Sequence, residues 1–212
     1  MYQVKVTLTG LIHMMHDRFF NPEELDAPRK KPKDFWRKEL PYKLWHDKKG
    51  VYVPSDNIRM MLIGNAHRPG AAKILGTFIE TKKGTEYLSF CKGCVWVVGP
   101  EDPLKVYVYP RRKTFDDYDE RSFINANKSR SLTRRPLITL PWSLSFYVQV
   151  TSNQFDADKV KEFFIVAGLR CGCCAYGPTF GRFKVTEWEV VAPDDVLTGE
   201  ETKKKKKARK LK

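Results

Sequence analysis

Alternating apolar and polar residues predict three strands, each with one face on a core. Residues 2–9 alternate, residues 142–150 alternate most clearly, and residues 183–190 alternate near the end of the chain. Apolar runs at residues 87–98 and 104–109, separated by Gly-Pro and Asp-Pro pairs, predict two more strands.

Two other segments have the apolar spacing of helices. One follows Ser55, which we predict as its N-cap, and Pro69 and Gly70 are its predicted stop. The other follows the predicted N-cap Asp156 and ends at Gly168, a residue that tolerates the left-handed conformation. The apolar positions of the two helices are Ile58, Met61, Leu62 and Ala66, and then Val160, Phe163, Phe164 and Ala167.

The order of these elements is strand, helix, strands, strand, helix, strand. It predicts an α+β fold of the ferredoxin-like (RRM-like) kind, an antiparallel sheet with two helices on one face. We expect one domain over residues 1–198, with basic loop insertions at about 18–50 and 110–137, because periodicity disappears there and Lys and Arg accumulate.

The charge of the chain indicates a polyanionic partner. The 212 residues include 39 Lys and Arg against 25 Asp and Glu, a formal charge of +14. Eight of these positive charges lie in residues 203–212, and subtracting them from +14 leaves +6 for the rest. We expect 199–212 to be a disordered basic tail, which could solubilise the protein, bind phosphate non-specifically or act as a nuclear address.

The cysteine count and hydropathy bear on the compartment. Five cysteines are an odd number, and the first residues have the pattern of a strand rather than of a signal segment. No stretch approaches the roughly 18 consecutive apolar residues that a membrane span needs. We therefore expect a cytoplasmic protein without a membrane partner.

The glycine-rich segment 168–183 is the best candidate for a binding site. Gly172, Gly177 and Gly181 would let the backbone approach a ligand and present N–H groups to phosphate. Arg170 and Arg182 would add charge, and aromatic residues such as Tyr176 would stack on unpaired bases.

This loop, together with the segment 52–59, resembles the repeat-associated RNA-binding (RAMP) superfamily of CRISPR effector proteins. Tyr-Val-Pro-Ser-Asp-Asn-Ile-Arg is similar to the strand-to-helix signature of the backbone subunits that coat guide RNA. The resemblance implies RNA contacts by Ser55, Asn57 and Arg59 and by the loop. The basic insertions would correspond to the finger and thumb that such subunits lay over RNA, with contacts from Arg111, Arg112, Lys113, Arg134 and Arg135.

The resemblance implies a non-catalytic protein that binds single-stranded or guide RNA beside copies of itself or paralogous subunits in a ribonucleoprotein. The chain departs from the family pattern at Met60 to Leu62 and at Cys173 and Cys174. It is also short for a backbone subunit, so a virus-borne stand-alone relative is an alternative.

Two further chemistries are open. Cys91 with Cys94 and Cys171 with Cys174 have the spacing of zinc half-sites, although cysteines in an apolar segment are also typical of a core, and we expect no cofactor. His13 and His16 could act as general base or acid in an endoribonuclease of the same fold, or simply end a strand. A zinc-stabilised adaptor that binds proteins through exposed aromatics is a third interpretation.

Overall fold

The computed structural model describes residues 1–25, 32–124 and 130–191 and has an α+β architecture. Its main sheet has the strand order β10-β1-β9-β6-β4-β3, and β5 also pairs with β9. All of these pairs are antiparallel. The strands are β1 (Tyr2–Gly10), β3 (His46–Asp47), β4 (Gly50–Pro54), β5 (Val95–Val98), β6 (Lys105–Tyr109), β9 (Ser143–Val150) and β10 (Phe183–Val191). The alternating segments predicted at both ends of the chain and at 142–150 are confirmed as β1, β10 and β9.

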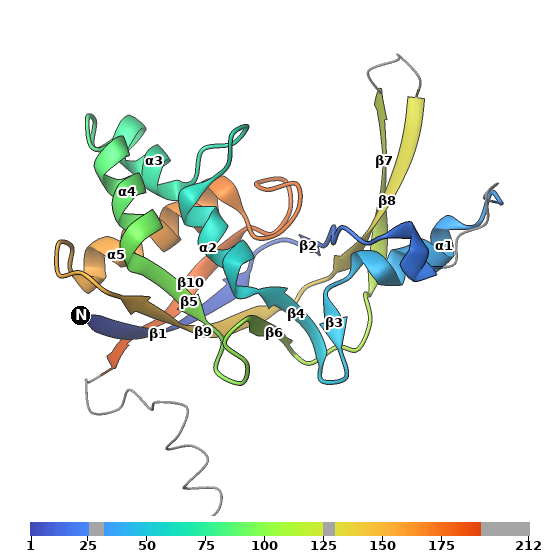
Figure 1. Ribbon diagram of the computed structural model, residues 1–212, viewed down its shortest axis with the longest axis horizontal. Coiled ribbons are helices and arrows are strands. Elements are labelled where there is room, and N and C mark those ends of the chain that lie inside the picture. Colours follow the sequence, from blue (N-terminus) through green and yellow to red (C-terminus); the bar gives the residue numbers. More distant parts are fainter. Residues whose placement is uncertain (26–31, 125–129, 192–212) are drawn as a thin grey trace, which may run out of the picture.

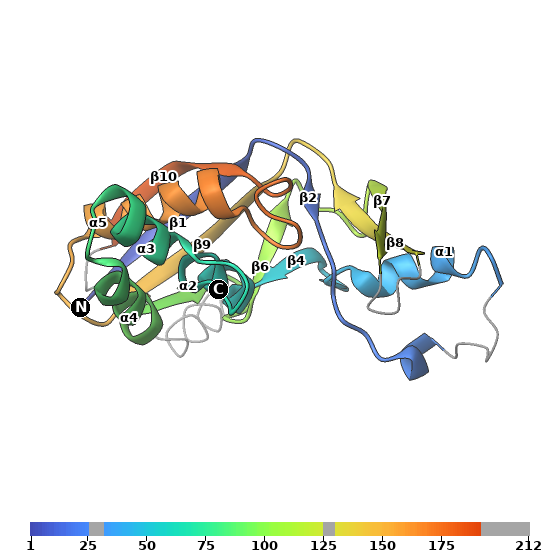
Figure 2. The same ribbon diagram turned by 90° about the horizontal axis from the view of Figure 1, so that it is seen from above.

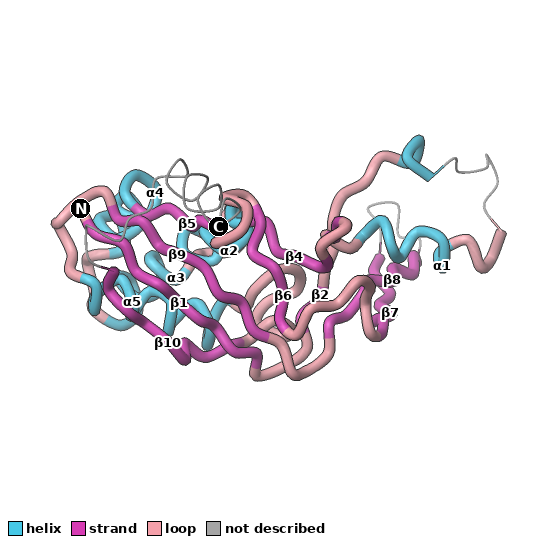
Figure 3. The backbone as a smooth tube through the Cα atoms, turned by 90° about the horizontal axis from the view of Figure 1, so that it is seen from below, coloured by secondary structure: helices cyan, strands magenta, loops and turns pink. Residues whose placement is uncertain are grey.

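Helices cover one face of this sheet and leave the other open (Figures 1, 2 and 3). They are α2 (Ser55–Ile63), α3 (Ala71–Ile74), α4 (Gly84–Cys94) and α5 (Ala157–Val166). A π-helical turn extends α3 over Leu75–Ile79 and α5 over Ala167–Cys171. The prediction of two helices was therefore incomplete, because α3 and α4 lie on the same face as α2 and α5.

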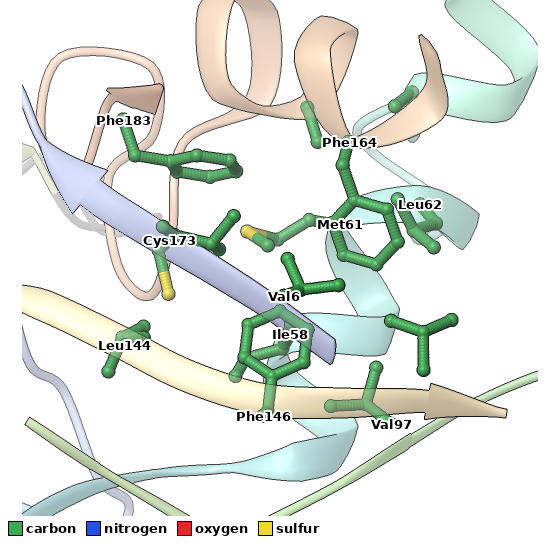
Figure 4. Packing of buried hydrophobic residues seen from close by; sticks show 14 of the residues in the cluster. Val6, Ile58, Met61, Leu62, Val97, Leu144, Phe146, Phe164, Cys173 and Phe183 are labelled. Atoms are coloured by element: carbon green, nitrogen blue, oxygen red, sulfur yellow. The ribbon is translucent and has the colours of Figure 1, made fainter. Parts of the chain in front are cut away.

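The core lies between this helical layer and the sheet. The alternation in β9 puts Leu144, Phe146, Val148 and Val150 on the buried side. Phe164 of α5 lies over Phe146, with ring centroids 5.9 Å apart. Figure 4 shows Cys173, from the glycine-rich segment, among these apolar side chains. The loop that we predicted to bind a ligand is thus partly anchored in the core.

The basic loop predicted at about 110–137 is wrong as a loop, because most of this insertion forms a β-hairpin. β7 (Asp117–Ile124) and β8 (Arg130–Ile138) pair antiparallel, and β8 also pairs with β2 (Met14–Met15). With α1 (Trp36–Glu39) and the 3₁₀ turns at Pro22–Leu25 and Leu40–Lys43, this sheet forms a second body beside the first, which we call the hairpin lobe (Figures 1 and 2). Trp36 joins α1 to the hairpin, 5.0 Å from the Tyr118 ring and 4.3 Å from the Arg134 guanidinium.

The strand predicted at 87–98 is also partly wrong. Residues 87–94 belong to α4, and only Val95–Val98 is a strand. Tyr87, Phe90 and Cys91 are the buried residues of this part of α4, and their spacing of three and four is helical. A continuous apolar run does not distinguish a buried strand from a helix, and the helical interpretation holds here.

Three helix ends differ from the prediction. Ser55 is the first residue of α2 rather than its N-cap, which is Pro54. The same helix stops at Gly64, with φ of 79°, before the predicted Pro69 and Gly70. α5 continues past Gly168 through the π-turn, and Gly172, with φ of 72°, is the left-handed residue that ends it. Asp156 is confirmed as the N-cap, since its carboxylate accepts a hydrogen bond of 2.8 Å from the Lys159 N–H.

The predicted tail 199–212 and the domain boundary at 198 lie outside the described residues. Within the described ranges, no helix is both long enough and apolar enough to cross a membrane.

Candidate nucleic-acid interface

A pocket of about 340 Å³ opens where α2, the glycine-rich loop and the segment after β2 meet. It therefore lies at the junction of the two bodies. Two of the predicted RNA-binding residues, Asn57 of α2 and Gly172 of the loop, line the same pocket. The other lining residues are His16, Asp17, Trp45, Met60, Met61, Gly64, Asn65, Arg68, Pro69, Gly70, Cys171, Cys174 and Ala175.

The glycine-rich loop is held in place by backbone hydrogen bonds to the chain that leaves β1. The Ala175 N–H donates to the Met15 carbonyl at 2.9 Å, and the Gly181 N–H donates to the His13 carbonyl at 2.8 Å. Within the loop, the Cys173 N–H donates to the Gly181 carbonyl at 2.8 Å. The loop is thus an ordered wall of the pocket.

Its glycines are required by the packing of the loop on itself. A Cβ on Gly177 would lie 1.8 Å from the Cys171 carbonyl oxygen, and one on Gly181 would lie 2.0 Å from that of Cys173. Gly181 also has a φ of 71°, which favours glycine. The close approach that we predicted between these glycines and a ligand is, in the structure, an approach between two parts of the same loop.

Arginines of the hairpin lobe lie against the aromatic residues of the loop. The Arg135 guanidinium lies 4.7 Å from the centroid of the Tyr176 ring, and Arg121 lies 5.2 Å from Tyr176 and 4.9 Å from Phe180. Arg135 also forms an ion pair of 2.6 Å with Asp17. The face of Tyr176 that we predicted to stack on a base is therefore close to the protein's own arginines.

His16 is the least expected residue of the pocket. Its side chain is fully buried, and within the described part of the chain neither ring nitrogen has a hydrogen-bond partner. Burial, and then the nearby His46, lower the pKa of His16 to about 3. The imidazole is therefore neutral near pH 7 and has a free N–H and a free lone pair. This low pKa does not suit the general acid or base that we considered for His16.

Several predicted RNA-binding arginines already have partners. The Arg59 side chain donates to the carbonyls of Val95, at 2.9 Å, and Lys92, and it lies 4.1 Å from the Trp96 ring. It thus satisfies carbonyls at the end of α4 and does not line the pocket.

In the second insertion, Arg111 is paired with Glu101, Arg112 with Asp116 and Arg134 with Glu120. Among the described residues, in contrast, the exposed side chains of Arg68, Lys113, Arg170 and Arg182 have no hydrogen bond, ion pair or ring contact. Ser55 is buried.

The cysteines behave as apolar thiols. Cys91 and Cys94 are both in α4. Cys171 is the last residue of the π-helical turn after α5, and Cys174 follows it in the glycine-rich loop. Burial raises the pKa of Cys91 to about 12 and that of Cys171 to about 11. In the ranges that the structure describes, no group of three His, Cys, Asp or Glu side chains could hold a metal ion.

Sequence reasoning named Asn57, Gly172 and the loop, but it missed Asp17, Trp45 and Arg68. Both Trp45 and Asp17 follow segments without a periodic pattern. The one signal for Trp45 was that an aromatic residue lies among charged residues. His13, the other catalytic candidate, is exposed, and its Nδ1 accepts a hydrogen bond from the Leu140 N–H at 3.3 Å.

No protein-family model matches the chain, and no curated protein matches its sequence.

Proposed function

We propose that this protein is a non-catalytic RNA-binding protein, of the kind that coats single-stranded or guide RNA as a backbone subunit of a CRISPR-like ribonucleoprotein. The observation that supports this most directly is the pocket. The start of α2 and the glycine-rich loop are far apart in the sequence, yet Asn57 and Gly172 line one cavity. These are the two segments in which the sequence resembles the RAMP superfamily.

The strand order supports a ferredoxin-like fold. β1 lies between β10 and β9, and β9 is followed in the sheet by β6. α2 precedes β5 and β6 in the chain, and α5 connects β9 to β10. This connectivity corresponds to two strand–helix–strand units, with the hairpin lobe as an insertion.

The charge distribution supports a phosphate-rich ligand. Arg170 and Arg182 precede and follow the glycine-rich loop, and both side chains are exposed. The formal charge of +14 means that the chain has more basic than acidic side chains. Phosphate groups of a ligand would pair with the basic side chains that have no acidic partner. On the open sheet face, Lys5 is directly opposite Glu189 in the β1–β10 pair.

We further propose that the protein acts beside copies of itself or paralogous subunits in a reducing compartment such as the cytoplasm. All five cysteines are free thiols, and burial raises the pKa of Cys91 and Cys171, which slows their oxidation. No step in this proposal needs a cofactor.

Fluorescence anisotropy with a labelled single-stranded RNA, at several salt concentrations, tests the proposal. Arg170→Gln and Arg182→Gln should each weaken binding by about 1–3 kcal/mol, because a charge-assisted contact is lost. Each should also reduce the salt slope by about 0.7, the value for one phosphate of a single strand.

Two variants serve as controls. Lys5→Gln removes one positive charge from the open sheet face and should leave affinity unchanged. Arg59→Gln should lower the melting temperature without changing affinity in the folded protein, because its hydrogen bonds stabilise the end of α4. Normal affinity and salt slope in both the Arg170 and Arg182 variants would overturn the proposed RNA path.

A further inference from the structure

A buried histidine and a pocket lined mostly by neutral side chains coincide at the junction of the two bodies. Among the residues that the structure describes, neither ring nitrogen of His16 has a hydrogen-bond partner, although the side chain is fully buried. Leaving a buried polar group unsatisfied costs about 1–3 kcal/mol. Such groups in a pocket are typical of a site where a ligand supplies the missing hydrogen bonds.

Most of the side chains that line the pocket with His16 are neutral, and the exceptions are Asp17 and Arg68. Asn57 has a carboxamide with two donors and an acceptor, and Cys171 and Cys174 are thiols whose pKa is raised by burial and, for Cys174, first by its neighbour Cys173. Met60, Met61 and Trp45 supply apolar and aromatic surface. The lining offers a phosphate a single cation, Arg68, whereas a flat neutral ring with donors and acceptors would find both stacking surface and hydrogen bonds.

The charged residues of the lining are Arg68 and Asp17, and because both are exposed we call their part of the pocket the rim. Arg68 lines the pocket with an exposed guanidinium that is free among the described side chains. Asp17 is the carboxylate of the rim, and its charge is balanced by Arg135 at 2.6 Å. A phosphodiester could therefore lie at the rim beside Arg68 while a group attached to it enters the pocket.

The volume limits the size of that group. The 340 Å³ of this pocket lies at the lower end of the range of about 300–1,000 Å³ for small-molecule sites. This volume fits one nucleoside and excludes a stacked oligonucleotide.

We infer that the pocket binds a single unstacked nucleobase, with His16 and Asn57 as hydrogen-bonding residues and Trp45 as an aromatic wall. This inference rests on the proposed RNA-binding function and deepens it. A protein that binds the backbone through arginines would then also select one base at a fixed register, because an unsatisfied His16 disfavours bases that cannot pair with it.

The full-length chain can be titrated with adenosine, cytidine, guanosine and uridine, with D-ribose and inorganic phosphate as further probes. At least one nucleoside should bind with a Kd of about 1 mM or tighter. Its affinity should not change with salt, since nucleosides have no phosphate. Ribose and phosphate should bind at least tenfold more weakly.

The variants identify the pocket. His16→Leu should weaken the nucleoside about tenfold, the value of one good hydrogen bond, while it keeps or raises the melting temperature because it removes unsatisfied buried atoms. Asn57→Ala should weaken it similarly, and Asn153→Ala, in the connection between β9 and α5 and outside the pocket lining, should have no effect. Asn153 accepts a hydrogen bond from the N-terminus instead.

The inference is overturned if no nucleoside binds, if phosphate binds as tightly as the best nucleoside, or if both pocket variants bind it normally. These results are distinct from failure of the proposed function. Tight RNA binding without nucleoside binding would remove only the base pocket. Nucleoside binding with unchanged RNA affinity in the Arg170 and Arg182 variants would remove only the phosphate path.

Discussion

The arginines of this protein differ in what their guanidinium groups already bind, and the sequence does not reveal the difference. Arg59 and Arg170 were predicted for the same role, but Arg59 donates to the end of α4 and Arg170 is exposed without a partner among the described residues. A side chain of this length reaches partners in other elements. Its role therefore depends on tertiary contacts that no spacing pattern records.

His16 should make the stability of the protein fall as the pH falls below its unfolded pKa. The native pKa is lowered from 6.5 to about 3, mainly by burial, so below pH 6.5 the unfolded chain binds a proton that the native protein does not. The free energy of unfolding should decrease by up to about 1.4 kcal/mol per pH unit in that interval. His16→Leu should remove this contribution.

Urea denaturation of the wild type and of His16→Leu at closely spaced pH values between 7 and 4 measures the effect. The difference between the two stability curves should be constant near neutral pH and should grow on acidification in favour of the variant. Parallel curves would mean that His16 is solvated or protonated in the native protein.

At the level of elements, the sequence predicted the strands and helices whose two faces meet different surroundings. β1, β9 and α5 have one side on the core, and their periodicity is clear. The β7–β8 hairpin has few buried positions, so it lacks alternation and was predicted as a loop. The C-terminal part of α4 coincides with the start of the apolar run 87–98. It was predicted as a strand because the apolar composition of the run was given more weight than the helical spacing of its residues.

Replacing a glycine by alanine should have opposite effects on the free energy of unfolding in the glycine-rich loop and in α4. Gly177→Ala should destabilise the protein by about 1–3 kcal/mol, because the Cβ would lie 1.8 Å from the Cys171 carbonyl oxygen and force the loop to shift. Gly93→Ala in α4 should stabilise it by about 0.5–1 kcal/mol, because among the described residues no atom outside the neighbouring helix backbone lies within 4 Å of the added Cβ, and alanine favours a helix.

Urea melts of both variants measure these changes, and RNA titration of Gly177→Ala then separates stability from binding. Wild-type stability in Gly177→Ala would show that the loop is looser than the structure indicates. In that case the glycine would again be available for close approach by a ligand.

At the scale of the whole molecule, the candidate site exists because two bodies meet. The main sheet and its helices supply Asn57 and the loop, while the chain that leads into and out of the hairpin lobe supplies His16 and Trp45. The sequence predicted both insertions by their charge but not that they fold together. That contact depends on pairings such as Arg135 with Asp17, which are distant in the chain.

The charge of the whole molecule separates into a body and a tail that can be tested independently. We predict that a chain ending at Thr202 keeps the melting temperature of the full protein, because residues 203–212 contain Ala208 and Leu211 as their only apolar residues. Its RNA affinity should fall at low salt, since eight positive charges are removed, but binding should persist through the +6 that remains.

The salt dependence identifies which part binds. In the truncated protein the slope should be smaller, and Arg170→Gln and Arg182→Gln should still reduce it by about 0.7 each, because those contacts belong to the body. Arginine variants without effect in the shortened chain would mean that other residues of the body bind RNA, and complete loss of binding after truncation would mean that the tail alone binds it. The pocket at the junction would then need a ligand other than RNA.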